Sequence, residues 1–175
     1  MTNYFIVPGI GNSGEDHWQT YFESLGDNFV RINQLNWDTP NCNDWTEIIE
    51  NNIAGYDANN TVLIGHSLGC IAITYWAKRY KKNIKAAMLV APSDTEAPKY
   101  TFASTGFSPV LMDKIPFKTV LVTSANDPWV SLERAALFAK NWNSALINIG
   151  DAGHINASSG HKEWEQGLQI LKSLG

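Results

Sequence analysis

The chain has 175 residues, a formal net charge of −4 and a hydrophobic fraction of 44%. This length is typical of one domain with a packed core, and we expect residues 1–175 to form a single domain. The basic cluster at residues 78–82 falls at the expected C-terminus of a helix, where cations offset the helix dipole. Composition therefore argues against a protein that binds nucleic acid.

From the sequence we expect neither a targeting signal nor a metal site. Cys42, in a polar stretch expected to be a loop, and Cys70, on an expected helix, lack the spacing of metal ligands, so we interpret both as free thiols of a reducing compartment. Residues 1–3 lack the basic start of a signal peptide, and no apolar run is long enough to span a bilayer. We expect a cytoplasmic protein that does not bind membranes.

Short apolar runs alternate with segments of helical periodicity along the chain. We predict strands at residues 4–7, 29–32, 61–64, 86–90, 119–123 and 145–149. We predict helices at residues 15–25, 45–53, 68–82, 132–142 and 164–174. The alternation predicts an α/β fold, a mostly parallel sheet with helices on both faces, whose functional residues lie at the carboxyl ends of the strands.

Residues 91–114 show no clear periodicity. They are too long for a bare connection, so we expect them either to contain a helix or to cover the site.

The loop after the first strand, residues 8–14, contains three glycines that match the spacing G-x-G-x-x-G of dinucleotide-binding loops. That interpretation requires the loop to open a helix and an acidic residue to follow the next strand. Asn33 and Gln34 stand there instead. We interpret the loop as part of an oxyanion hole, and a nucleotide-binding module remains an alternative.

The sequence Gly65-His66-Ser67-Leu68-Gly69 lies between a predicted strand and a predicted helix. Strand, tight turn and helix form the setting of a nucleophile elbow, in which the serine has strained backbone angles. Glycines on either side allow the strand and the helix to approach closely. The Ser67 hydroxyl would lie at the positive end of the helix dipole, which favours a developing oxyanion. An ordinary loop that contains a serine is the alternative.

Asp127 and His154 follow the last two predicted strands, so that the residue order is Ser, Asp, His, as in α/β-hydrolases. A histidine base oriented by a carboxylate would activate the Ser67 hydroxyl. Asp127 precedes Pro128 and is alternatively a turn residue, with Asp94 and Asp151 as rival acids.

The other histidines have competing interpretations. His161 is the rival base, although it lies farther from the strand end, and His154 is alternatively a loop residue. We expect His66 to be structural and to point away from the nucleophile. His17 either lines the pocket or caps the first helix.

Several motifs together resemble a known family. They are Pro8-Gly9-Ile10-Gly11-Asn12-Ser13, His17-Trp18, Gly65-His66-Ser67-Leu68-Gly69-Cys70, Leu89-Val90-Ala91-Pro92, Asn126-Asp127-Pro128 and Gly153-His154-Ile155-Asn156-Ala157. The chain resembles, over essentially its whole length, the small serine hydrolases of α/β-hydrolase fold related to retinoblastoma-binding protein nine, the YdeN-like serine hydrolases.

The resemblance implies a catalytic triad of Ser67, Asp127 and His154, and an oxyanion hole made by the backbone amides of Ile10 and Leu68. It also implies esterase-like activity. The motif L-x-C-x-E, which binds the retinoblastoma pocket, is absent from the sequence, so such a partner is not supported.

We therefore predict a serine hydrolase that cleaves a small acyl ester through an acyl-enzyme and needs no metal or organic cofactor. The alternative from another class is a non-catalytic binding protein that retains the hydrolase fold.

Overall fold

The computed structural model describes residues 1–174, which form one six-stranded sheet with the order β2-β1-β3-β4-β5-β6. Every neighbouring pair of strands is parallel. The strands are β1 (Asn3–Val7), β2 (Phe29–Arg31), β3 (Thr61–His66), β4 (Ala86–Val90), β5 (Lys118–Thr123) and β6 (Ala145–Asn148). All six predicted strands are present, and parallel pairing places their carboxyl ends at one edge of the sheet.

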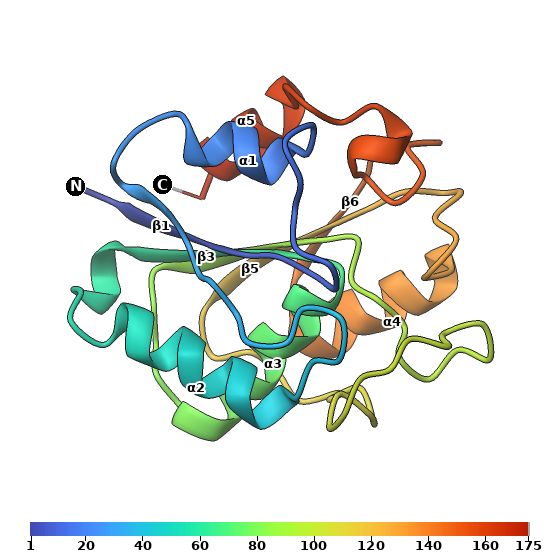
Figure 1. Ribbon diagram of the computed structural model, residues 1–175, viewed down its shortest axis with the longest axis horizontal. Helices are drawn as coiled ribbons and strands as arrows, with labels where there is room; N and C mark the ends of the chain where they lie inside the picture. The colour runs from blue at the N-terminus through green and yellow to red at the C-terminus, as the bar shows by residue number, and fades with distance from the viewer. Residues whose placement is uncertain (175) are drawn as a thin grey trace.

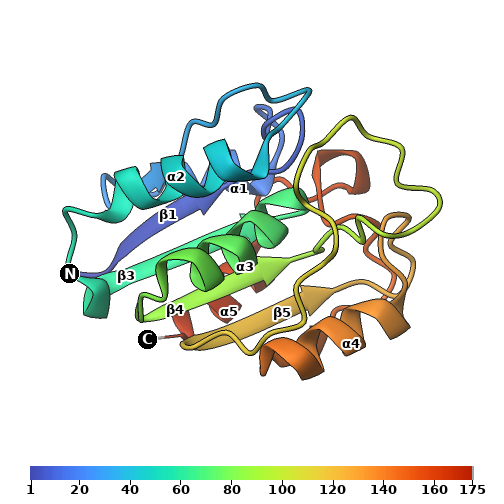
Figure 2. The ribbon, with the colours of Figure 1, turned by 90° about the horizontal axis from the view of Figure 1, so that it is seen from below.

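Helices cover both faces of the sheet, as predicted. They are α1 (Trp18–Glu23), α2 (Cys42–Ile53), α3 (Leu68–Tyr80), α4 (Leu132–Trp142) and α5 (Glu165–Lys172). Figure 1 shows α1 and α5 above the sheet and the other three helices below it, and Figure 2 shows these three from below. Within residues 1–174, no helix is both long enough and apolar enough to cross a membrane.

The core consists of two apolar clusters, one on each face of the sheet. Leu63 faces the cluster under α2, α3 and α4, whereas its neighbours Val62 and Ile64 face the cluster under α1 and α5. Both faces of a strand such as β3 are therefore buried, which explains why it reads as a continuous apolar run. The tryptophans of the helices, including Trp45 and Trp18, pack into these clusters.

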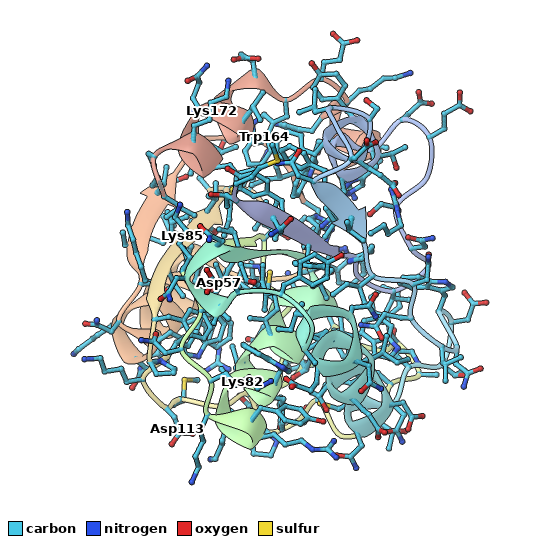
Figure 3. All side chains as sticks on the ribbon, turned by 90° about the vertical axis from the view of Figure 1, so that its left-hand side faces the viewer. Asp57, Lys82, Lys85, Asp113, Trp164 and Lys172 are labelled. Carbon is cyan, nitrogen blue, oxygen red and sulfur yellow. The ribbon has the colours of Figure 1, made fainter. Side chains whose placement is uncertain are left out.

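Figure 3 faces the amino ends of the strands, where Asp57, Lys82 and Lys85 lie. The basic cluster falls at the C-terminus of α3, as predicted, and Lys81 caps that helix in a left-handed conformation. This basic cluster is thus accounted for by helix capping and dipole compensation.

Two helices begin three residues away from their predicted starts, because of their caps. The helix predicted from residue 15 begins only at Trp18, since His17 is its N-cap and its side chain accepts a hydrogen bond from the Gln19 amide. The α2 helix begins earlier than predicted, at Cys42, because the Asn41 side chain caps it. Cys42 is therefore a buried helical residue and not part of a polar loop.

The irregular segment between β4 and β5 contains no helix or strand, apart from an isolated bridge between Thr105 and Asn41. Figure 2 shows it extending across the end of the sheet where the strands finish. Of the two alternatives for residues 91–114, a covering segment is the one that the structure contains.

Candidate active site

Ser67 occupies the turn between β3 and α3, and its backbone is strained. Its φ of 56° and ψ of −124° lie outside the regions that L-residues normally adopt. The flanking glycines make this turn possible, since a Cβ on Gly69 would lie 2.1 Å from the Val7 carbonyl oxygen and one on Gly65 would lie 2.8 Å from Ile73 Cδ1. At Gly69 the backbone of β1 passes too close for any side chain, whereas at Gly65 the closest atom is the end of the Ile73 side chain.

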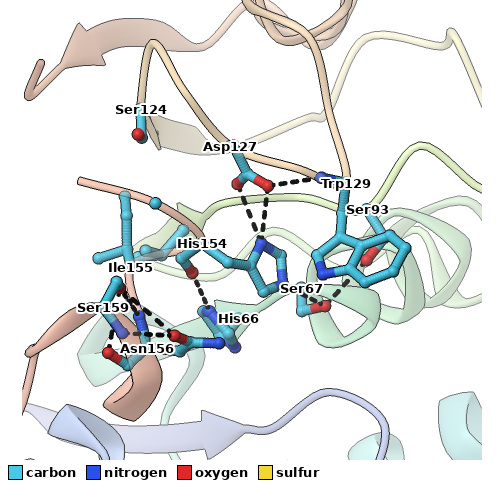
Figure 4. Close-up of polar contacts among 12 residues, drawn as sticks. His66, Ser67, Ser93, Ser124, Asp127, Trp129, His154, Ile155, Asn156 and Ser159 are labelled. Carbon is cyan, nitrogen blue, oxygen red and sulfur yellow. Dashed lines mark hydrogen bonds and ion pairs between the residues drawn. The ribbon is translucent and has the colours of Figure 1, made fainter. Parts of the chain in front are cut away.

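The structure brings the three predicted residues together (Figure 4). Ser67 Oγ lies 3.0 Å from His154 Nε2, and His154 Nδ1 lies 2.9 Å and 3.0 Å from the two carboxylate oxygens of Asp127. The Asp127 side chain is completely buried and also accepts a hydrogen bond from the Trp129 amide. Because a carboxylate only accepts, Nδ1 carries the imidazole proton, which leaves Nε2 of the neutral ring to accept from the Ser67 hydroxyl.

The rival residues lie elsewhere. Asp94 forms a bidentate ion pair with Arg134, with distances of 2.8 Å and 2.9 Å. Asp151 is exposed to solvent. His161 pairs with Ser159 Oγ and with neither Ser67 nor an acid. The hydrogen-bond geometry therefore favours Asp127 and His154 over each of their rivals.

His66 is buried beside His154 and has a structural contact, as predicted, although it also lines the cavity. Its Nε2 donates to the His154 carbonyl oxygen at 2.9 Å, and its ring lines the same cavity as Ser67. Burial is the main cause that holds the pKa of His66 well below its ordinary value of 6.5, and the nearby imidazoles of His17 and His154 act in the same direction. His66 thus supports the loop that carries His154 and adds no charge to the site.

His17 has both of the roles between which the sequence left the choice open. Its Nδ1 accepts from the Gln19 amide at 3.1 Å, and its ring lines the cavity. Burial is the main cause that lowers its pKa to about 3, with a smaller contribution from Arg31. His17 is therefore neutral at physiological pH.

The predicted oxyanion-hole residues flank Ser67. Leu68 is the first residue of α3, so its amide belongs to the group at a helix N-terminus that lacks an intrahelical partner. Ile10 lines the cavity from the first loop, which packs so closely that a Cβ on Gly9 would lie 2.8 Å from Ser67 Cβ. Arg31 fixes this loop by donating to Asn12 Oδ1 at 2.8 Å and to the Ser13 carbonyl at 2.9 Å. The role of the two amides remains a prediction.

A cavity of about 210 Å³ opens beside Ser67. Three aromatic side chains that the sequence analysis did not assign to the site form one wall, Tyr100, Phe102 and Trp129, with successive ring centroids 5.4 Å and 4.9 Å apart. Ser93 was also missed, although it follows β4 at the same edge as the other site residues. Within residues 1–174, no group of three or more His, Cys, Asp or Glu side chains could hold a metal ion.

Comparison with known proteins identifies the family. A model of the serine hydrolase family matches residues 4–173. The chain belongs to this family. A YdeN-like hydrolase from Pectobacterium atrosepticum has a similar structure, with 30% identity and a TM-score of 0.88 over 99% of this chain and 90% of that chain. The ydeN gene product of B. subtilis has 20% identity and a TM-score of 0.85 over 99% of this chain and 98% of that chain. The predicted YdeN-like family is therefore confirmed.

More distant structures confirm the α/β-hydrolase fold. A thermophilic esterase from Thermogutta terrifontis has 13% identity and a TM-score of 0.70, over 99% of this chain and 89% of that chain. At that identity the likeness concerns the fold alone. No protein of curated function matches the chain.

Proposed function

We propose that this serine hydrolase cleaves small neutral acyl esters, with Ser67 as nucleophile, His154 as general base and acid, and Asp127 as the residue that orients His154. The observation that carries the proposal is the continuous chain of hydrogen bonds from Ser67 through His154 to Asp127 at the wall of a cavity. A serine hydroxyl is a weak nucleophile until a base accepts its proton, and this chain supplies that base in the required tautomer.

The reaction would proceed through an acyl-enzyme. Ser67 Oγ attacks the ester carbonyl carbon while its proton passes to His154 Nε2, and the amides of Ile10 and Leu68 donate to the resulting oxyanion. The C–O bond to the alcohol breaks as His154 returns the proton to the leaving oxygen. Water, deprotonated by His154, then attacks the acyl carbon, and the C–Oγ bond breaks to release the acid and restore Ser67.

The size and charge of the cavity favour a small neutral substrate. Its volume of about 210 Å³ is below the range of roughly 300–1,000 Å³ found for sites that bind drug-sized ligands. No Lys, Arg, Asp or Glu side chain lines it, and burial lowers the pKa of His17 and His66, the two histidines beside His154. A charged acyl group would lose its hydration there without gaining a partner.

A panel of p-nitrophenyl esters tests the proposal. We expect hydrolysis of the acetate and butyrate, a fall in kcat/KM at the octanoate, and a loss on the order of 10⁴- to 10⁶-fold in kcat for Ser67→Ala. Ser108→Ala, which changes an exposed serine, is the matched control and keeps wild-type rates. Equal turnover by Ser67→Ala and wild type would refute the proposal and favour a non-catalytic binding protein.

The structure of the first loop argues against the alternative that the protein is a nucleotide-binding module. Helix α1 begins at Trp18, four residues after Gly14, so the glycine motif does not open a helix as a pyrophosphate site requires.

A further inference from the structure

Ser93 places a second hydroxyl beside the proposed nucleophile. It lies three residues after the end of β4, and its Oγ is 2.8 Å from Ser67 Oγ (Figure 4). Ser93 is 3% exposed and lines the cavity. Ser67 Oγ therefore has two polar partners, His154 Nε2 and Ser93 Oγ.

The direction of the hydrogen bond between Ser93 and Ser67 follows from the positions of the protons on His154 and Ser67. His154 donates its Nδ1 proton to Asp127, so its Nε2 accepts the proton of the Ser67 hydroxyl. The Ser67 hydroxyl has no second proton to donate, but its oxygen has lone pairs that can accept a hydrogen bond. Ser93 is therefore the donor and Ser67 Oγ the acceptor.

Hydrogen bonds fix the residues on both sides of Ser93, and the Ser93 amide itself donates to the Ser67 carbonyl at 3.4 Å. On one side, Ala91 has a positive φ of 48°, and its amide donates to the Val122 carbonyl at 2.8 Å. On the other side, Asp94 is clamped by Arg134 through two hydrogen bonds. Such fixed placement is required of a donor that acts on a transition state, because no reorganisation is then needed when charge develops.

We propose that Ser93 is a catalytic residue that donates a hydrogen bond to Ser67 Oγ and mainly accelerates deacylation; this inference rests on the proposed role of Ser67 as nucleophile. In the acyl-enzyme, Oγ is an ester oxygen and a weak acceptor. When the tetrahedral adduct of water collapses, the C–Oγ bond breaks and Oγ takes up negative charge before His154 returns its proton. A hydrogen bond to an ionised oxygen is about twice as strong as a neutral one, so the Ser93 bond strengthens in this step.

Acylation gains less from the same hydrogen bond. Before attack, Ser67 Oγ is a hydroxyl oxygen that already accepts fully from Ser93, so part of the stabilisation is present in the ground state. Only an interaction that is stronger in the transition state than in the ground state raises a rate constant. The two half-reactions should therefore respond unequally to the loss of this one hydroxyl.

Stopped-flow hydrolysis of p-nitrophenyl acetate by wild type, Ser93→Ala and Ser108→Ala separates the two steps. We expect deacylation by Ser93→Ala to slow by about 10- to 100-fold and acylation by less than about threefold. The variant should therefore show a burst approaching one p-nitrophenolate per enzyme before a slow steady state. Ser108→Ala, which removes an exposed hydroxyl from the same irregular segment, should behave as wild type.

A second variant, Ser93→Cys, keeps nearly the same size with a weaker donor, and its deacylation rate should fall between those of wild type and Ser93→Ala. An unchanged ratio of acylation to deacylation in both variants would overturn the role of Ser93. The rate of Ser67→Ala distinguishes this result from failure of the proposed function. If Ser67→Ala hydrolyses p-nitrophenyl acetate as fast as wild type, the proposed function itself is wrong.

Discussion

Among the aspartates that follow strands, Asp127 is distinguished at the residue scale by its completely buried side chain and its two contacts with His154. We predict that Asp127→Asn lowers kcat by roughly 10²- to 10⁴-fold, because an amide next to Nδ1 favours the wrong tautomer of His154. Asp151→Asn changes an exposed carboxylate and should stay within about tenfold of wild type. Steady-state kinetics, with circular dichroism to verify folding, measure both effects. A large loss of kcat in Asp151→Asn with little loss in Asp127→Asn would show that Asp151, and not Asp127, is the acid of the triad.

The buried His17 makes stability depend on pH. Its pKa is about 3 in the folded protein and near its ordinary value of 6.5 in the unfolded chain. The unfolded chain therefore binds more protons between these values, and stability is highest above pH 6.5 and falls as the pH decreases toward 3. At pH 5 the loss from this one group is about 2 kcal/mol.

Urea unfolding of wild type and His17→Gln at pH 7 and pH 5 measures this effect. We expect the variant to lose about 2 kcal/mol less than wild type over this interval, because glutamine does not titrate. His66 also lowers stability as the pH falls, in the same direction in both proteins. If both proteins lose the same free energy of unfolding between pH 7 and pH 5, His17 must be protonated in the folded state at pH 5, which would contradict the lowered pKa.

At the scale of elements, the turn between β3 and α3 depends on close contact with β1. A Cβ on Gly69 would lie 2.1 Å from the Val7 carbonyl oxygen, whereas one on Gly55 would meet nothing within 4 Å. We predict that Gly69→Ala lowers the free energy of unfolding by about 3 kcal/mol or more, and that Gly55→Ala changes it by less than about 1 kcal/mol. Chemical denaturation measures both values. Equal stability of the two variants would mean that the turn relaxes without cost.

The starts of two helices show how far local sequence signals reach. Asn41, a favoured capping residue, precedes α2, so its start at Cys42 could have been read from the sequence. His17 caps α1 with an imidazole, which is outside the usual set of capping residues, and no local signal indicated that the helix begins so late. The strands β1, β3, β4 and β5 were predictable because each is a short apolar run whose residues are mostly buried, whereas the edge strands β2 and β6 are apolar runs that are only partly buried or exposed.

At the scale of the whole molecule, the two apolar clusters share one sheet. Neighbouring residues of β3, such as Leu63 and Val62, face opposite clusters, so neither cluster can open without exposing part of the other. We predict a single cooperative unfolding transition, with equal calorimetric and van't Hoff enthalpies, as expected of the proposed single domain. Differential scanning calorimetry measures both enthalpies. Two resolved transitions would contradict the single-domain prediction.

The site was predictable where topology alone places residues together. Ser67, Asp127 and His154 follow parallel strands, whose carboxyl ends must meet at one edge of the sheet. Ser93 also follows a parallel strand and lies at the same edge of the sheet, but the sequence analysis considered only Asp94 after that strand. The positions of Tyr100 and Phe102 were not predictable, because the segment that carries them has no periodicity and is fixed by long-range contacts such as the Asp94–Arg134 ion pair.

The proposal that Ser67 is the nucleophile is tested most directly by covalent labelling with a fluorophosphonate, followed by mass spectrometry of the digested protein. We predict one adduct per chain, on the peptide that contains Ser67, and no adduct in Ser67→Ala. The same reagent should label Ser108→Ala as it labels wild type. An unlabelled wild-type protein, or an adduct on another residue such as Ser93, would contradict the proposed mechanism.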